Sequence, residues 1–261
     1  MADRSGKRQE PMALTEELKL INVGLTHHTP HDFFRSQWQS EVKSCVFLVY
    51  RWILAVFFGT GLCSFLVIYF IRGTVFIYLT TWGFTLCSLT SISGAIFTSL
   101  YHANTELMVN RSSMIKWYWA CYWTNLILAH VIAFVYWTVM YYRKPPMDLI
   151  SRIYDVWIHG LPVVLLNVDH MLVAHPTRVL HMIYPFYFGL GYLLFTYIYY
   201  LCGGLSRHGT TYIYRMLDFD NLGLTSITIV FITIFIMGFS IMQYGVYRLR
   251  VCIARRLNKL L

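Results

Sequence analysis

Six apolar stretches of about 20 residues divide this 261-residue chain, and they constrain its fold more than any other feature. A helix of roughly 20 residues crosses a hydrocarbon core of about 30 Å. Because no water is present there to satisfy the backbone, only helices and closed barrels can span it. The composition agrees, since 57% of the residues are hydrophobic and 13% are charged. The pattern predicts an all-α integral membrane bundle of six transmembrane helices.

The six expected spans cover approximately residues 50–71, 75–99, 117–142, 153–173, 179–201 and 222–247. They define three parts: a polar N-terminal segment, residues 1–44, a six-helix transmembrane domain, residues 45–247, and a basic tail, residues 248–261. The N-terminal segment lacks the apolar core of a cleaved signal peptide, so we expect the first span to direct insertion. Near Phe33, Phe34 and Trp38 we expect this segment to lie at the membrane surface.

Lys and Arg are distributed unequally between the two ends of the spans. Fifteen of the 21 cationic residues lie in segments that six crossings place on the same side as both termini. Cytoplasmic segments are rich in Lys and Arg, so we expect both termini in the cytosol. The tail, with five cationic residues, is expected to bind anionic lipids of that leaflet. Since the basic residues flank apolar spans, the net charge of +9 does not indicate nucleic-acid binding.

The fourth span is unusual because it contains ionisable residues, among them Asp155, His159, Asp169 and His170. Polar groups at membrane depth usually face a bundle interior. Asp155 and His159 are four residues apart, and Asp169 returns to within about 40° of the same face of an α-helix. Pro162, between them, predicts a kink. These groups either pair with one another and with Asn125 or His130, which would join helices, or serve a reaction or a transport path.

Thr80, at the start of the second span, is the candidate nucleophile. If both termini are cytosolic, spans two and four run in the same direction, so Thr80 and His159 can lie at similar depth. His159 would then act as the base, and Asp155 or Asp169 would orient it. The alternative for this span, which is rich in hydroxyl and small residues, is close helix packing with hydroxyls bonded to their own backbone.

Nothing in the chain indicates a cofactor or a metal centre. His27, His28 and His31 are close in sequence, but a metal site needs further ligands and none lies nearby. A transporter or channel lined by the polar groups of the fourth span is a third interpretation. The spans show no inverted repeat, which is a common feature of transporters.

Several strings of residues resemble one family. They are YRW at 50–52, YLTTWGF at 78–84, KWYW at 116–119, the run over 175–204 and YIYRMLDF at 212–219. Together they resemble the rolling stone proteins, which are multi-pass membrane proteins of animals. The resemblance implies a plasma-membrane protein with a role in cell contact or in myoblast fusion.

The rolling stone proteins are in turn distantly similar to the androgen-induced-gene membrane hydrolases. Those enzymes cleave fatty-acid esters of hydroxy fatty acids with an intramembrane threonine and histidine, and Leu79-Thr80 matches the placement of their threonine. Their motif is His-x-x-His followed by Thr, whereas this chain has Pro162 where the second, catalytic histidine stands. Proline has no basic group, so His159 would have to replace it. We therefore expect a non-enzymatic membrane protein, with hydrolysis of a lipid ester as the alternative.

Overall fold

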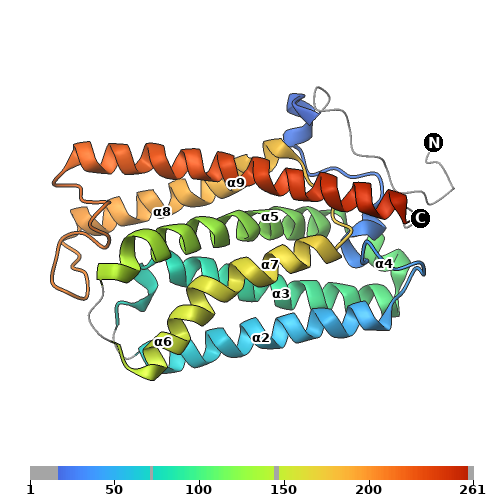
Figure 1. Cartoon of the computed structure of the whole chain (residues 1–261), viewed down its shortest axis with the longest axis horizontal. Helices are drawn as coiled ribbons and strands as arrows, with labels where there is room; N and C mark the ends of the chain where they lie inside the picture. The colour runs from blue at the N-terminus through green and yellow to red at the C-terminus, as the bar shows by residue number, and fades with distance from the viewer. Residues whose placement is uncertain (1–16, 71–72, 144–146, 258–261) are drawn as a thin grey trace.

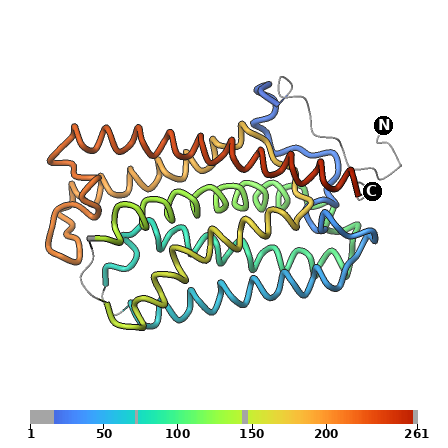
Figure 2. The backbone as a smooth tube through the Cα atoms, in the orientation of Figure 1, coloured from blue at the N-terminus to red at the C-terminus, as the bar shows by residue number. Residues whose placement is uncertain are grey.

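A computed structural model describes residues 17–70, 73–143 and 147–257 and arranges them as one bundle of long helices (Figures 1 and 2). The prediction of six membrane-length helices is confirmed. They cover Cys45–Tyr69, Leu79–Ala103, Ser112–Met140, Leu149–Leu172, Val179–Leu201 and Leu222–Arg256. Within the described ranges, the extended backbone forms a single isolated antiparallel bridge, between Ser36 and Val173.

Short turns divide several of the spans. The long and short α-helices are α2 (Cys45–Tyr69), α3 (Leu79–Ala103), α4 (Thr105–Val109), α5 (Ser112–Val135), α6 (Leu149–Asp155), α7 (Leu161–Leu172), α8 (Ile183–Leu201) and α9 (Leu222–Arg256). There are two π-turns: η5 (Tyr136–Met140) extends α5, and η7 (Val156–Gly160) joins α6 to α7. The 3-10 turns are η1 (Leu20–Val23), η2 (Pro30–Phe34), η4 (Val75–Ile77), η6 (Tyr141–Arg143) and η8 (Val179–Met182).

Two of the long helices begin at residues that suit an N-cap. Ser44 accepts a hydrogen bond from the Phe47 N–H at 3.3 Å, and Asn221 accepts one from the Leu224 N–H at 3.1 Å. Each satisfies one of the N–H groups that lack a partner at the start of a helix. These caps fix where α2 and α9 begin. Since α9 continues without a break to Arg256, the first residues of the predicted tail belong to this last helix.

The kink predicted near Pro162 is confirmed. Proline has no N–H to donate to the carbonyl four residues earlier, and its ring pushes that carbonyl away. The chain accommodates this with η7, and the helix changes direction between α6 and α7 (Figure 1).

Close packing of α2, α3 and α5 depends on glycine and on hydroxyls bonded to their own helix. A Cβ atom at Gly94 would lie 2.7 Å from the Tyr118 hydroxyl, and one at Gly83 would lie 2.5 Å from Ile132. Ser88 and Thr98 donate to the carbonyls four residues earlier, at 3.0 and 2.8 Å. This confirms the helix-packing interpretation of the second span.

The N-terminal segment lies across one end of the bundle, next to the end of α9 (Figure 1). We call this the terminal end, and the opposite end, with the loop over residues 202–221, the loop end. Phe33 and Phe34 are buried, and Trp38 donates to the Met171 carbonyl at 2.8 Å. Arg178 donates to the carbonyls of Gly24 and Thr26, both at 2.8 Å. The segment over residues 17–44 is therefore packed against the bundle, whereas the sequence predicted only a segment at the membrane surface. Residues 1–16 are not among those that the structure describes.

Candidate functional site

Two deeply buried charges of the bundle form an ion pair between α2 and α7. Arg51 Nη1 lies 3.0 and 3.2 Å from the two carboxylate oxygens of Asp169. Tyr50 donates to the same carboxylate at 2.9 Å, and Arg51 donates to the Tyr118 hydroxyl at 3.0 Å. A buried charge is costly unless it is paired and hydrogen-bonded. Both conditions are met here, so Asp169 joins helices and does not face a cavity.

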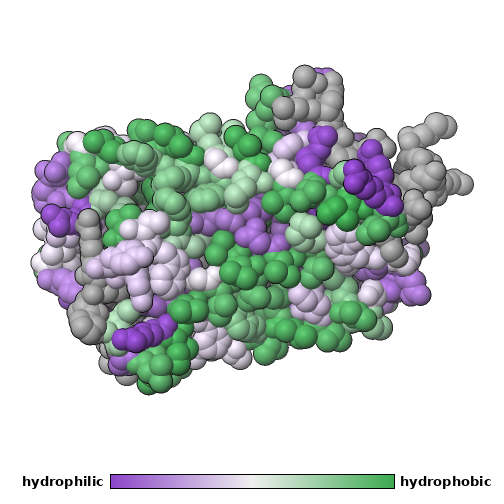
Figure 3. All heavy atoms as spheres, in the orientation of Figure 1, coloured by the Kyte–Doolittle hydropathy of each residue, from purple (hydrophilic) through white to green (hydrophobic). Residues whose placement is uncertain are grey.

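A second polar cluster joins α5, α7 and α9 near mid-span. Asn167 and Gln243 both donate to His130 Nε2, at 2.9 and 3.0 Å, and Gln243 also donates to the side-chain oxygen Oδ1 of Asn167 at 2.8 Å. His130 Nδ1 lies 2.7 Å from the Leu126 carbonyl. On one face of the molecule, hydrophilic atoms lie in a hollow between the apolar surfaces of α7 and α9 (Figure 3). His130 was a predicted partner for the ionisable groups Asp155, His159 and Asp169, but the residue of the fourth span that it contacts is Asn167.

A third set of contacts fastens the last helix to the terminal end. Arg250, which is fully buried, donates to the His170 carbonyl and, at 2.6 Å, to the His175 carbonyl. His175 Nε2 lies 3.1 Å from the Phe33 carbonyl of the N-terminal segment. Burial, and then the nearby guanidinium groups of Arg51 and Arg250, hold the pKa of His175 well below its ordinary value. His175 is therefore neutral, and it connects the N-terminal segment to the bundle.

Asp155 and His159 lie together, as their spacing predicts. His159 Nδ1 is 3.1 Å from the Asp155 carbonyl and 3.8 Å from the Asp155 carboxylate. The imidazole stacks on the Tyr136 ring, with centroids 3.5 Å apart and planes 9° from parallel. The Tyr136 hydroxyl is hydrogen-bonded to Asp155. The three side chains form one cluster between η5 and η7.

Asp169 does not share this cluster, and the π-turn explains why. A π-turn inserts one residue relative to an α-helix, which rotates everything after it by about 100°. The estimate that Asp169 returns to the face of Asp155 assumes a continuous α-helix. With η7 between them, Asp155 contacts Tyr136 of η5 and Asp169 contacts Arg51 of α2.

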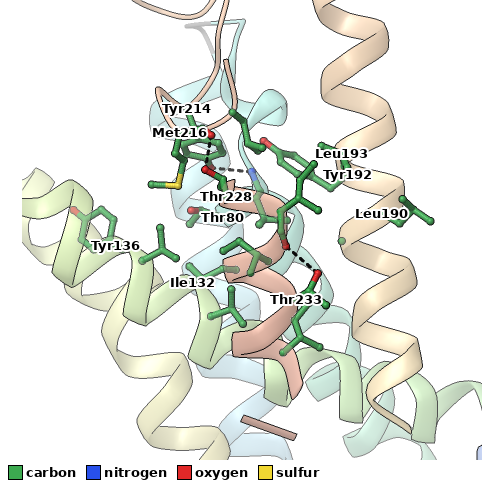
Figure 4. Close-up of a pocket in the computed structure, with 18 of the residues that line it drawn as sticks. Thr80, Ile132, Tyr136, Leu190, Tyr192, Leu193, Tyr214, Met216, Thr228 and Thr233 are labelled. Atoms are coloured by element: carbon green, nitrogen blue, oxygen red, sulfur yellow. Dashed lines mark hydrogen bonds between the residues drawn. The ribbon is translucent and has the colours of Figure 1, made fainter. Parts of the chain in front are cut away.

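Thr80 lies apart from these groups, in the wall of an apolar cavity of about 160 Å³ at the loop end (Figure 4). The cavity is enclosed by the start of α3, the end of α5, both α8 and α9, and the 202–221 loop. Tyr136 also lines it. The same Tyr136 ring stacks on the imidazole of His159. His159 itself does not line the cavity, and neither does any other histidine that the structure describes.

Tyrosine hydroxyls gather beside Thr80 at the upper end of the cavity. Tyr214, from the loop, accepts a hydrogen bond from the Leu79 N–H at 3.1 Å and is hydrogen-bonded to the Thr80 side chain. Tyr192, from α8, donates to the Ile77 carbonyl at 2.7 Å. Burial raises the pKa of Tyr214 to about 12, so its hydroxyl keeps its proton at neutral pH.

Sequence reasoning missed the tyrosines of this site. Tyr136 resembles one more residue of an aromatic belt, and Tyr214 lies in a loop far from Thr80 in the sequence. One signal was present: Tyr136 and His159 lie in consecutive spans, Ser112–Met140 and Leu149–Leu172. No sequence pattern connects Tyr214 with Thr80.

The histidines near the N-terminus bind separate partners. His27 Nε2 is 3.1 Å from the Asp32 carboxylate, and His31 Nδ1 is 2.8 Å from the Tyr101 hydroxyl. Among the residues that the structure describes, no three His, Cys, Asp or Glu side chains converge as metal ligands.

Six long helices with an apolar exterior and polar groups paired inside define a multi-pass membrane protein. Comparison with known proteins then identifies the family. Residues 11–260 match the family described as "Protein rolling stone", and the chain belongs to this family. Protein rolling stone of Drosophila melanogaster is 33% identical over 254 residues, which cover 91% of this chain and 90% of that protein. No solved structure matches the chain.

Proposed function

We propose that this protein acts at the plasma membrane in cell contact and cell–cell fusion, such as the fusion of myoblasts, without catalysing a reaction. The role in fusion is an inference from membership of the rolling stone family. One observation supports the absence of catalysis: Thr80 lines the apolar cavity, whereas His159 stacks on Tyr136 and does not line it. A threonine nucleophile needs a base within hydrogen-bond reach.

In this proposal both termini lie in the cytosol, as the distribution of Lys and Arg predicts. The loop end then faces the outside of the cell, and the 202–221 loop is presented to a neighbouring cell. At the terminal end, the exposed side chains of Arg255 and Arg256 lie at the inner leaflet, where anionic lipids attract cations.

A complementation experiment tests the proposal. Myoblasts that lack the protein are given wild-type, Thr80→Ala or His159→Ala protein, with Thr60→Ala, a hydroxyl residue on the exposed face of α2, as the matched control. Fusion index and surface biotinylation are measured in the same cells. We expect all three variants to restore fusion to the wild-type level. A loss of fusion with Thr80→Ala or His159→Ala protein that reaches the surface in normal amount would refute a non-enzymatic role.

Lipid-ester hydrolysis is the second candidate function, and the apolar cavity around Thr80 is the observation that favours it. Thr80 would be the nucleophile and His159 the base, which requires the imidazole, now outside the cavity lining, to approach the hydroxyl. Labelling with a fluorophosphonate tests this directly. Labelling that disappears in both Thr80→Ala and His159→Ala would establish the enzyme, whereas folded protein without Thr80-dependent labelling would remove it. We do not propose transport. A path would be lined by Asp155 and Asp169 together, whereas Asp155 pairs with His159 and Asp169 pairs with Arg51.

A further inference from the structure

The cavity at Thr80 has its mouth on the side of the bundle. Three of its lining residues are exposed on the outer surface: Phe186 by 39% and Leu190 by 47% on α8, and Ile229 by 37% on α9. On a membrane-spanning bundle, side chains exposed at this position face lipid tails. The opening therefore lies between α8 and α9 and connects the cavity to the bilayer.

The shape of the mouth follows from how α8 and α9 pack. At the terminal end, Val179 of η8 forms a buried apolar cluster with Tyr244, Tyr247 and Val251 of α9. Toward the loop end, residues of both helices line the cavity, among them Leu193 of α8 and Thr233 of α9. The gap is thus closed at one end of α9 and open at the other.

The inner wall is apolar and buried. Val131 and Ile236 are 2% and 3% exposed and form part of the cavity lining. The volume, about 160 Å³, is close to that of an apolar protein cavity that binds benzene, so it holds roughly six carbon atoms. This space suits a stretch of one hydrocarbon chain. The rest of a longer chain can leave through the mouth, along the exposed residues of α8.

The upper end of the cavity differs because polar groups gather there. Thr80 and Tyr214 supply hydroxyls, and Leu79 and Thr80 are the first two residues of α3. Because the Leu79 N–H already donates to Tyr214, the hydroxyl groups are the donors for an oxygen acceptor, such as a carboxylate or an ester carbonyl. The loop residues Tyr214 and Met216 cover this end. The polar end therefore lies near the surface of the membrane and the apolar end lies deeper, which is the orientation of a lipid in one leaflet.

We propose that this cavity binds one acyl chain of a lipid, which enters sideways between α8 and α9 and places its oxygen-bearing end at Thr80 and Tyr214. The occupant is a lipid because the mouth opens to the bilayer and the loop covers the end nearest to water. This site requires no reaction, and it does not depend on the role in fusion.

Two glycines of α8 provide a matched test. Gly189 lines the cavity, and a Cβ atom there would have Ile236 Cδ1 as its nearest neighbour, at 4.0 Å, so Gly189→Phe places a ring in the cavity. Gly191 is exposed and has nothing within 4 Å of an added Cβ. It points about 200° away around the helix, toward lipid. Gly191→Phe is therefore the control with the same change of residue.

The protein is reconstituted in nanodiscs and irradiated with a photoreactive fatty acid or, separately, with a photoreactive phosphatidylcholine. Adducts are located by mass spectrometry. We expect saturable labelling of Ile132, Ile236 and their neighbours, reduced at least fivefold in Gly189→Phe and unchanged in Gly191→Phe. The probe that labels identifies the occupant as a free fatty acid or a phospholipid chain, and either result supports the site.

Two results with wild-type protein would overturn the proposal. One is labelling that unlabelled lipid cannot displace, and the other is labelling only of outward-facing residues such as Leu194 and Ile198. Equal labelling of both folded phenylalanine variants would do the same. If Gly189→Phe does not fold, the displacement experiment and the map of adducts on wild-type protein still decide the matter.

Discussion

The ion pair between Arg51 and Asp169 allows a quantitative test of how this bundle is held together. Both side chains are almost fully buried, at 3% and 2% exposure. Their remaining hydrogen bonds go to Tyr50 on the carboxylate and to Tyr118 and, at 3.5 Å, His175 on the guanidinium. Each charge thus depends on the other, and removing one leaves its partner buried and unneutralised.

The expected energies follow from that geometry. Arg51→Met or Asp169→Asn alone should lower the free energy of unfolding by about 3–5 kcal/mol, the usual cost of breaking a buried ion pair. The double variant Arg51→Met/Asp169→Asn has no buried charge and keeps an acceptor for Tyr50. Its cost should be only about 1–3 kcal/mol, that of one unpaired Tyr118 hydroxyl. Independent effects would instead sum to roughly 6–10 kcal/mol.

Unfolding is measured by titrating the purified protein from a mild detergent into SDS, with tryptophan fluorescence as the signal. Arg111→Met, at an exposed arginine, is the matched control and should leave the unfolding midpoint unchanged. The reasoning fails if either single variant is as stable as wild-type protein. It also fails if the double variant is destabilised by the sum of the single effects.

Three further predictions concern the terminal end and the helix contacts. Since burial and two neighbouring arginines hold the pKa of His175 below 6.5, the unfolded chain takes up a proton that the folded chain does not. The free energy of unfolding should therefore fall as the pH drops below about 6.5, and His175→Gln should reduce that slope in SDS titrations at several pH values. Gly94→Ala should cost about 1–3 kcal/mol because its Cβ meets the Tyr118 hydroxyl, whereas Gly191→Ala should be neutral. Phe33→Ala should cost about 3–5 kcal/mol and increase hydrogen exchange over residues 20–39.

The architecture could be predicted because its cause acts on each segment separately. Every span must satisfy its own backbone within lipid, so its length and hydropathy are visible in the sequence. The hydroxyls of the second span and the kink at Pro162 are also local effects, and both predictions hold. Contacts between helices depend on rotation about each axis, which one inserted residue changes. The π-turn η7 is such an insertion, and for that reason the partner of Asp169 could not be derived from its spacing to Asp155.

The N-terminal segment was harder to predict because its partners are distant in sequence. Arg178 contacts Gly24 and Thr26 more than 150 residues away, and nothing near these residues marks them as partners. The cavity shows the same limit. The sequence offers Thr80 as a candidate, but its neighbour Tyr214 belongs to a loop that only the fold brings to α3.

The polar network and the cavity occupy different parts of the bundle, and this separation bears on how variants should be interpreted. Arg51, Asp169 and Arg250 connect α2, α7 and α9 toward the terminal end, so their loss acts on folding. The cavity at the loop end is lined by neutral side chains, and filling it at Gly189 removes none of those contacts. If the proposed role in fusion holds, a variant that loses fusion while it remains folded and at the cell surface should map to the loop end. If such variants instead map to the ion pair, the network must have a direct role in fusion in addition to holding the helices together.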